Sequence, residues 1–229
     1  MLYNFNYIIF MIPAFVLMLI TSWYVNAAYK RWSQVQASSR MTGLQAAQRL
    51  ISAGGLFDVR LEEIGGNLSD NYDPRNKVLH LSRGVAEVAS VASLAISAHE
   101  LGHAMQDKED YLPLRFRAAL VPMVNIGSTV GWIMIMAGLL LNFLNLAWLG
   151  VAFFAGGAVF ALATLPVELN ASQRARVLLT NSGLVTSEQE MRGVSNVLNA
   201  AALTYVAALV TSLLQLLYFV NLVGGRRRR

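Results

Sequence analysis

The residues with the clearest capacity for chemistry are His99, Glu100 and His103, which form the pattern H-E-x-x-H. Residues four apart lie on one face of a helix, so two imidazoles at this spacing can bind one metal ion. Zinc accepts such nitrogens at about 2.1 Å, and it lowers the pKa of a bound water towards ~7. Glu100 can then take a proton from that water without being a ligand. The pattern predicts a zinc-dependent hydrolytic site, against the alternative of two ordinary helix histidines.

A third protein ligand must complete such a site, and the sequence leaves few candidates for it. Cysteine is absent, and position 109, where some related sites carry a further histidine, is Glu109. His80 and the carboxylates remain. Glu168 is the leading candidate, because an apolar hairpin returns the chain to the side of the membrane that it left, and a carboxylate at a membrane edge needs a partner. The alternative for Glu168 is a helix-start carboxylate favoured by the helix dipole.

Four other side chains are candidates for supporting roles. His80 is either an ordinary strand histidine or a donor to a developing oxyanion. Ser172, four residues after Glu168, is placed to bond to a zinc-binding imidazole. Arg174 and Arg176 lie about two turns beyond Glu168, where either could orient that carboxylate or contact a substrate.

Four apolar segments predict the framework that positions these residues. Each is close to the ~20 residues needed to cross the hydrocarbon core of a bilayer. We read the first as an anchor and not a cleaved signal, because it has no basic flank before it. Pro166 is expected to end the third. The segments run from about Tyr7 to Val25, Ala119 to Leu141, Leu146 to Leu165 and Ala201 to Val223.

Basic residues near the ends of these segments indicate the orientation. Those in the two polar regions between spans are Lys30, Arg31, Arg115, Arg117, Arg174, Arg176 and Arg192. The positive-inside rule then predicts that both regions, and the metal site, are cytoplasmic. The run Arg226–Arg229 falls outside in this orientation, against the rule. It could instead contact anionic lipid head groups.

The larger polar region predicts a small mixed α and β unit. Thr42 can cap a short helix, and the alternation in residues 57–64 and 78–82 predicts two strands. Residues 69–76 are read as turns, and one helix is expected from about Ala86 to Lys108. We expect the edge of strand 78–82 to hold an extended substrate by strand addition.

Composition excludes several classes of protein. Hydrophobic residues make up 55% of the 229 residues and charged residues 14%, which is unlike a soluble or a disordered chain. The net charge of +5 resides mostly in Arg226–Arg229, since residues 26–118 hold 11 basic and 10 acidic residues. The folded part therefore has no basic face, and nucleic acid is not expected as a partner. No ionisable residue lies inside an apolar segment, which argues against an ion-coupled transporter.

Three segments resemble the YugP-type neutral zinc metallopeptidases. They are N-Y-D-P-R-N-K-V-L-H-L-S at 71–82, A-H-E-L-G-H-A-M-Q at 98–106 and P-V-E-L-N-A-S at 166–172. More distantly, Glu168-x-x-Ala171 is similar to the E-x-x-A-D element of the HtpX and CAAX-protease-like membrane gluzincins, with Ser172 in place of their Asp. The resemblance implies His99, His103 and Glu168 as zinc ligands and Glu100 as general base.

We therefore expect a mainly α membrane protein with about four transmembrane helices and a zincin-like α+β catalytic unit. The expected parts are an anchor (1–25), the catalytic unit (26–118), a transmembrane hairpin (119–165), a helical segment with the third ligand (166–200) and a last span with the basic tail (201–229). The predicted function is a one-zinc endopeptidase of a bacterial-type cell membrane, acting on membrane-associated polypeptides. A proteolytically silent zinc-binding adaptor or chaperone and a channel are the alternatives; a homo-oligomer and a regulatory partner stay open.

Overall fold

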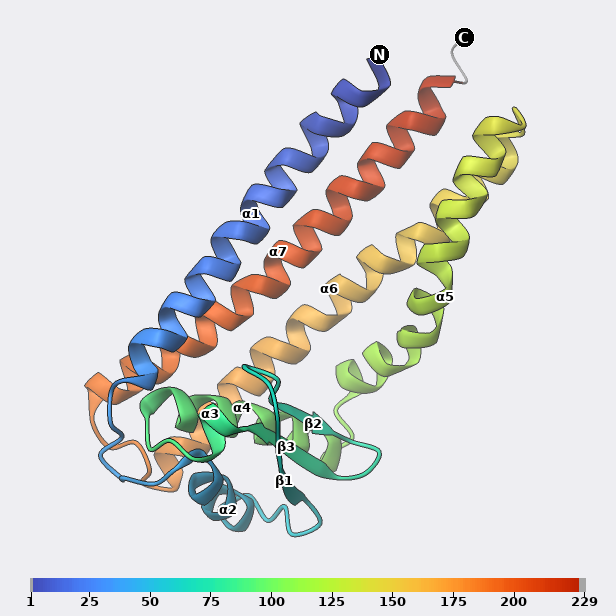
Figure 1. Ribbon diagram of the computed structural model, residues 1–229. Helices are drawn as coiled ribbons and strands as arrows, with labels where there is room; N and C mark the ends of the chain where they lie inside the picture. Colours follow the sequence, from blue (N-terminus) through green and yellow to red (C-terminus); the bar gives the residue numbers. More distant parts are fainter. Residues whose placement is uncertain (1, 227–229) are drawn as a thin grey trace. The chain divides into compact units, whose positions relative to one another are not determined.

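The computed structural model describes residues 2–226, so Arg227–Arg229 of the basic tail lie outside the described residues. Helices dominate, with one small sheet (Figure 1). The helices are α1 (Leu2–Ser33), α2 (Gly43–Ala53), α3 (Arg83–Ala86), α4 (Val91–Lys108), α5 (Leu112–Leu140), α6 (Leu144–Asn181) and α7 (Glu188–Arg226), and the strands are β1 (Arg60–Ile64), β2 (Asn71–Asp73) and β3 (Val78–Ser82).

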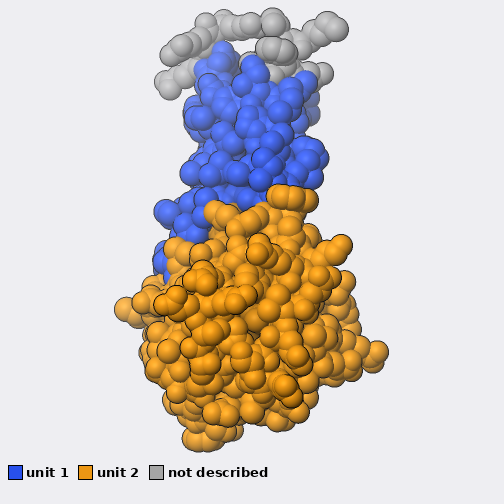
Figure 2. Space-filling model, turned by 90° about the vertical axis from the view of Figure 1, so that its left-hand side faces the viewer, with its two compact units in different colours: residues 1–21, 115–166, 204–229 blue, residues 22–114, 167–203 orange. Residues whose placement is uncertain are grey.

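Two compact units share the chain, and Figure 2 colours them separately. Unit 1 comprises residues 1–21, 115–166 and 204–229. Unit 2 comprises residues 22–114 and 167–203, and it contains the sheet and the H-E-x-x-H pattern.

Four helices are long and apolar enough to cross a membrane, as the sequence predicts: α1, α5, α6 and α7. Many of their large apolar side chains are exposed, among them Phe15, Ile126 and Leu162. Such side chains are stable in contact with lipid tails and costly in contact with water. The chain is therefore a mainly α membrane protein with a small α+β unit.

Small residues bring α5 and α6 close together within unit 1. A methyl group added at Gly131 would lie 2.8 Å from the carbonyl oxygen of Gly150, and one added at Gly138 would collide with the backbone of Ala147. Helices in a membrane associate largely through such close packing. The short connection between α5 and α6 passes through Asn142, whose φ of 55° lies in the left-handed region.

The prediction that Pro166 ends the third apolar helix is wrong, because α6 continues through it to Asn181. Proline removes one backbone hydrogen bond but is tolerated inside membrane helices, where neighbouring groups can satisfy the freed carbonyl. As a result, Glu168, Ser172 and Arg176 all lie on α6.

The sheet has the order β1-β3-β2, so β3 is the central strand (Figure 1). β1 runs parallel to β3 and β2 runs antiparallel to it. The expectation of a free edge on residues 78–82 is therefore wrong, because both edges of β3 are paired. The strand β2 itself lies in residues that the sequence analysis read as turns.

The helix expected from Ala86 to Lys108 is interrupted. α3 ends at Ala86, and α4 begins only after Ser90, whose hydroxyl accepts a hydrogen bond from the backbone of Ser93. Ser90 is thus an N-cap, and its extended backbone separates the two helices. The core of unit 2 is built around α4 and includes the fully buried Leu50, Leu79, Leu81, Leu94, Leu101 and Leu179.

The N-terminus of α2 allows a test of helix capping in unit 2. Thr42 and Gln45 form a capping box, in which each side chain bonds to the backbone N–H of the other. Thr42→Ala should lower the free energy of unfolding by about 1 kcal/mol. Thermal unfolding in detergent measures it. Ser52→Ala, which removes an exposed hydroxyl from the same helix, should change stability by less than about 0.5 kcal/mol. Equal losses in both variants would contradict the cap.

Candidate metal centre

The helix α4 carries His99, Glu100 and His103. It is rich in alanine, a strong helix former, and Ala92, Ala95 and Ala98 are buried in the core of unit 2. The two imidazoles lie one turn apart, with ring centroids 4.9 Å apart and the rings nearly perpendicular. The helix therefore holds two nitrogen donors on one face, as the spacing predicts.

Glu168 on α6 completes a cluster with the two histidines. Its Oε2 lies 3.2 Å from Nε2 of His99 and 3.4 Å from Nε2 of His103, and the residue is only 2% exposed. Ligand atoms at ~2.1 Å from a tetrahedral zinc lie roughly 3.4 Å from one another. All three ligand atoms fall within 4.8 Å of each other. Two imidazoles and a carboxylate at these separations fit a metal ion of the zinc type.

A glycine inside the pattern permits this convergence. A methyl group added at Gly102 would lie 2.5 Å from the carbonyl oxygen of Ala171, so α4 and α6 touch backbone to backbone here. Ala171 is fully buried. Any side chain at position 102 would push α6 away and move Glu168 from the histidines.

Gln106 orients the ring of His103. The Nε2 of Gln106 donates to the carbonyl of Val167 at 2.8 Å and to Oδ1 of Asn170 at 2.9 Å. Its Oε1 is therefore the atom 3.0 Å from Nδ1 of His103, and that nitrogen must donate its proton. The bond fixes the tautomer of His103 with Nε2 free for a metal ion.

Ser172 has the matching place beside His99. Its Oγ lies 3.2 Å from Nδ1 of His99, on the far side of the ring from Glu168. The serine is buried. Each histidine thus has a polar partner at Nδ1 and Glu168 at Nε2.

The carboxylate of Glu100 faces the sheet. Its Oε2 accepts a hydrogen bond of 3.0 Å from the backbone N–H of Tyr72 on β2. Burial raises the pKa of Glu100 above its ordinary value, against the opposing effect of the two histidines. Burial lowers the pKa of His103, but its bond to Glu168 and the charge of Glu100 raise it further, so the net shift is upward. The carboxylates of Glu100 and Glu168 therefore favour the positively charged form of His103.

The remaining candidates lie away from the three ligand atoms. The imidazole of His80 lies 3.4 Å from the amide of Asn71 and 3.5 Å from the carboxylate of Glu62. Arg174 donates to Oδ1 of Asn170 at 2.7 Å and pairs with Glu109 at 2.7 Å. Through Asn170 it supports Gln106 and not Glu168. Arg176 contacts residues of α7.

Three residues of the site were missed at the level of sequence. Gln106 lies three residues after His103 and so shares its helix face, which is a readable signal. Asn170 lies two residues after Glu168 and has no such signal. Tyr72 contributes only its backbone, which no side-chain pattern reveals.

An H-E-x-x-H helix beside a buried glutamate, in a chain with four helices of membrane length, is the arrangement of a membrane metallopeptidase. The family model described as "Putative neutral zinc metallopeptidase" matches residues 7–224. The chain therefore belongs to this family of zinc metallopeptidases. It is 42% identical over 203 residues to "Putative membrane protease YugP" of Bacillus subtilis (strain 168), covering 88% of this chain and 90% of that protein. No solved structure gives a significant match.

The role of Gln106 can be tested by replacing it with leucine. Gln106→Leu removes the acceptor at Nδ1 of His103 and should weaken zinc affinity by about 10- to 100-fold. Competition with a chelator of known affinity measures the change. Gln48→Leu, on the exposed side of α2, is the matched control and should leave zinc affinity unchanged. Equal zinc affinity in Gln106→Leu and the wild type would contradict the orienting role.

Proposed function

We propose that this chain is an integral membrane zinc endopeptidase of the H-E-x-x-H type with glutamate as third ligand. His99, His103 and Glu168 hold one zinc ion, and Glu100 is the general base. The observation that carries this proposal is the convergence of the three ligand atoms within 4.8 Å, with the carboxylate of Glu100 on the same helix.

Each residue of the proposed site has its own role in peptide hydrolysis. A zinc ion bound here would supply a water of lowered pKa and polarise the carbonyl of the scissile bond. Glu100 takes the proton from the attacking water and passes it to the leaving amine. Burial favours this role, because it raises the pKa of the carboxylate and so its basicity. Gln106 and Ser172 hold the imidazoles in orientation.

The edge strand β2 is suited to holding an extended substrate. In an antiparallel pair, a residue whose N–H points away from the partner strand also points its carbonyl away. The N–H of Tyr72 bonds to Glu100, so the carbonyl of Tyr72 also faces outwards from β3 and is the group to which a substrate N–H would bond. A substrate strand that pairs there would lie within reach of the general base. We therefore propose that β2 holds the substrate, and not β3, for which the sequence analysis expected this role.

Membrane-associated polypeptides are the proposed substrates. Glu168 follows the apolar run 146–165 by only three residues in the sequence. The site therefore belongs close to the membrane surface. The basic residues around the polar regions favour the cytoplasmic side.

The role of Glu100 is tested by its amide. Glu100→Gln should retain zinc at about one ion per chain and lose roughly 10²- to 10⁴-fold in kcat. The measurements are metal content and cleavage of casein and of a membrane-protein mixture, with detergent-purified full-length protein. A chelator should abolish wild-type cleavage, and added zinc should restore it.

His99→Ala is the matched control and should lose zinc and cleavage together. Wild-type rates in Glu100→Gln would remove Glu100 from the mechanism. Zinc in both the wild type and Glu100→Gln, with cleavage by neither, would favour the adaptor over the peptidase.

The role of β2 is tested with the substrate, because the N–H of Tyr72 already bonds to Glu100. A peptide methylated at the backbone nitrogen that would donate to the carbonyl of Tyr72 loses one hydrogen bond, and its KM should rise by about 2- to 10-fold. The same peptide methylated at the next nitrogen, which points to the other side of an extended strand, is the matched control and should keep its KM. If methylation at no position raised KM, strand addition at β2 would be excluded.

A further inference from the structure

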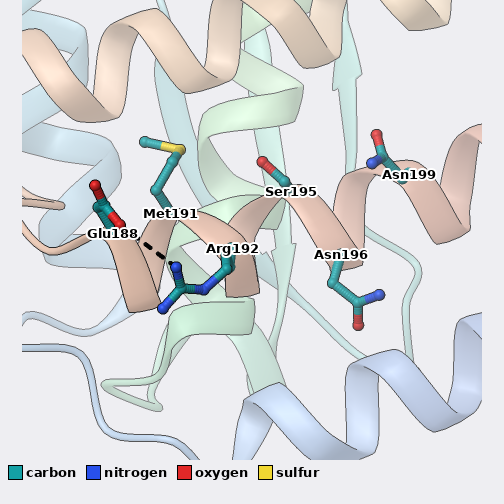
Figure 3. Close-up of a pocket in the computed structure, with 6 residues that line it drawn as sticks. All are labelled: Glu188, Met191, Arg192, Ser195, Asn196 and Asn199. Carbon is teal, nitrogen blue, oxygen red and sulfur yellow. Dashed lines mark hydrogen bonds and ion pairs between the residues drawn. The ribbon is translucent and has the colours of Figure 1, made fainter.

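An open recess lies on the part of α7 that belongs to unit 2 (Figure 3). Its volume is about 480 Å³. Positions 192, 195 and 199 follow one another at spacings of three and four, so their side chains form one stripe on the helix. We call Arg192, Ser195 and Asn199 the polar stripe. Glu188, Met191 and Asn196 also line the recess.

Arg176 of α6 reaches this stripe from the neighbouring helix. Its Nε donates to Oγ of Ser195 at 3.2 Å, and one terminal nitrogen donates to Oδ1 of Asn199 at 2.7 Å. Within residues 2–226, no carboxylate lies at ion-pair distance from Arg176. A partly buried cation bonded only to neutral oxygens lacks the charge compensation that such a group requires.

The other groups of the recess leave donors free for an anion. The oxygen of Asn196 accepts from the indole N–H of Trp32, and its nitrogen donates to the hydroxyl of Tyr24, so its amide is held away from the stripe. Arg192 pairs with Glu188 at 3.5 Å, but their side chains are 70% and 93% exposed. Such a pair contributes little and yields readily to a better partner.

We propose that Arg176 and the polar stripe form a binding site for a phosphate group. The guanidinium fork matches phosphate oxygens in geometry, and the hydroxyl of Ser195 and the amide of Asn199 add neutral donors. A phospholipid head group and a free phosphate ester share this chemistry.

The sequence that follows favours a phospholipid as the source. The apolar run of residues 201–223 begins two residues after Asn199. Leu203, Val206 and Val210 continue the spacing of the stripe and are exposed. A lipid whose acyl chains lie along such a face brings its head group to the level of the stripe.

The experiment measures lipid binding to the detergent-purified full-length protein by native mass spectrometry. Phosphatidylglycerol is compared with phosphatidylcholine, and glycerol phosphate provides the free-phosphate arm. Arg176→Gln should weaken phosphatidylglycerol binding by about fivefold, the typical contribution of one basic residue at a membrane surface.

Asn199→Asp keeps the test decisive if Arg176→Gln fails to fold. The new carboxylate would lie beside Arg176 and replace the missing anion, so this variant should unfold no earlier than the wild type and should also bind phosphatidylglycerol at least fivefold more weakly. Arg83→Gln removes an exposed arginine elsewhere on unit 2 and should stay within twofold of the wild type.

Loss of phosphatidylglycerol binding in Asn199→Asp that exceeds the loss for phosphatidylcholine, whose choline partly neutralises the same phosphate, supports the site and assigns a lipid source. Glycerol phosphate that binds alone and displaces the lipid supports the site and assigns a free phosphate. Unchanged binding in Asn199→Asp overturns the proposal. So does a loss in Arg83→Gln as large as that in Arg176→Gln, because the effect would then be one of net charge. None of these results depends on proteolysis.

Discussion

The close contact between α4 and α6 is the constraint on which the site depends. Neither helix can form the candidate metal centre alone, because α4 carries the two nitrogens and α6 carries the oxygen of the cluster. The backbones meet at Gly102 and Ala171, and there is no room for a side chain at position 102. Gln106 bridges the same two helices by bonding to the backbone of Val167. Packing, metal geometry and the histidine tautomers are therefore aspects of one helix–helix contact.

Electrostatics and packing act together at this contact. A buried glutamate is costly unless positive charge lies beside it, and the two histidines supply hydrogen bonds that a metal ion would replace with stronger interactions. The carboxylate of Glu100 instead accepts a hydrogen bond from the backbone of β2. The sheet is small, yet it gives the carboxylate of Glu100 a fixed partner, and its edge is the place where we propose that a peptide binds. The three-stranded sheet is thus part of the site and not only a cover for the core.

Much of this could be predicted from local patterns, and the failures have physical causes. The strand 78–82 and the cap at Thr42 follow from alternation and capping chemistry and lie as expected. β2 was missed because Asn71, Asp73 and Pro74 are typical of turns, and only pairing with β3 makes the segment a strand. Pro166 does not end α6, because neighbouring groups in a membrane helix can satisfy the carbonyl that proline leaves without a backbone partner. The three proposed ligands have residue types and spacing that can be recognised in the sequence, whereas the places of Asn170 and of the N–H of Tyr72 depend on tertiary packing.

The distance in sequence between the ligands also bears on how the protein is made. His99 and Glu168 are 69 residues apart, and ribosomes add roughly 5–20 residues per second. The H-E-x-x-H segment is therefore synthesised several seconds before Glu168, its proposed third ligand, which lies within α6. If Glu168 is that ligand, a chain that ends before it has no complete metal centre and would not cut its neighbours at the site of membrane insertion. Synthesis of α5 and the first part of α6 would then be a condition of activity.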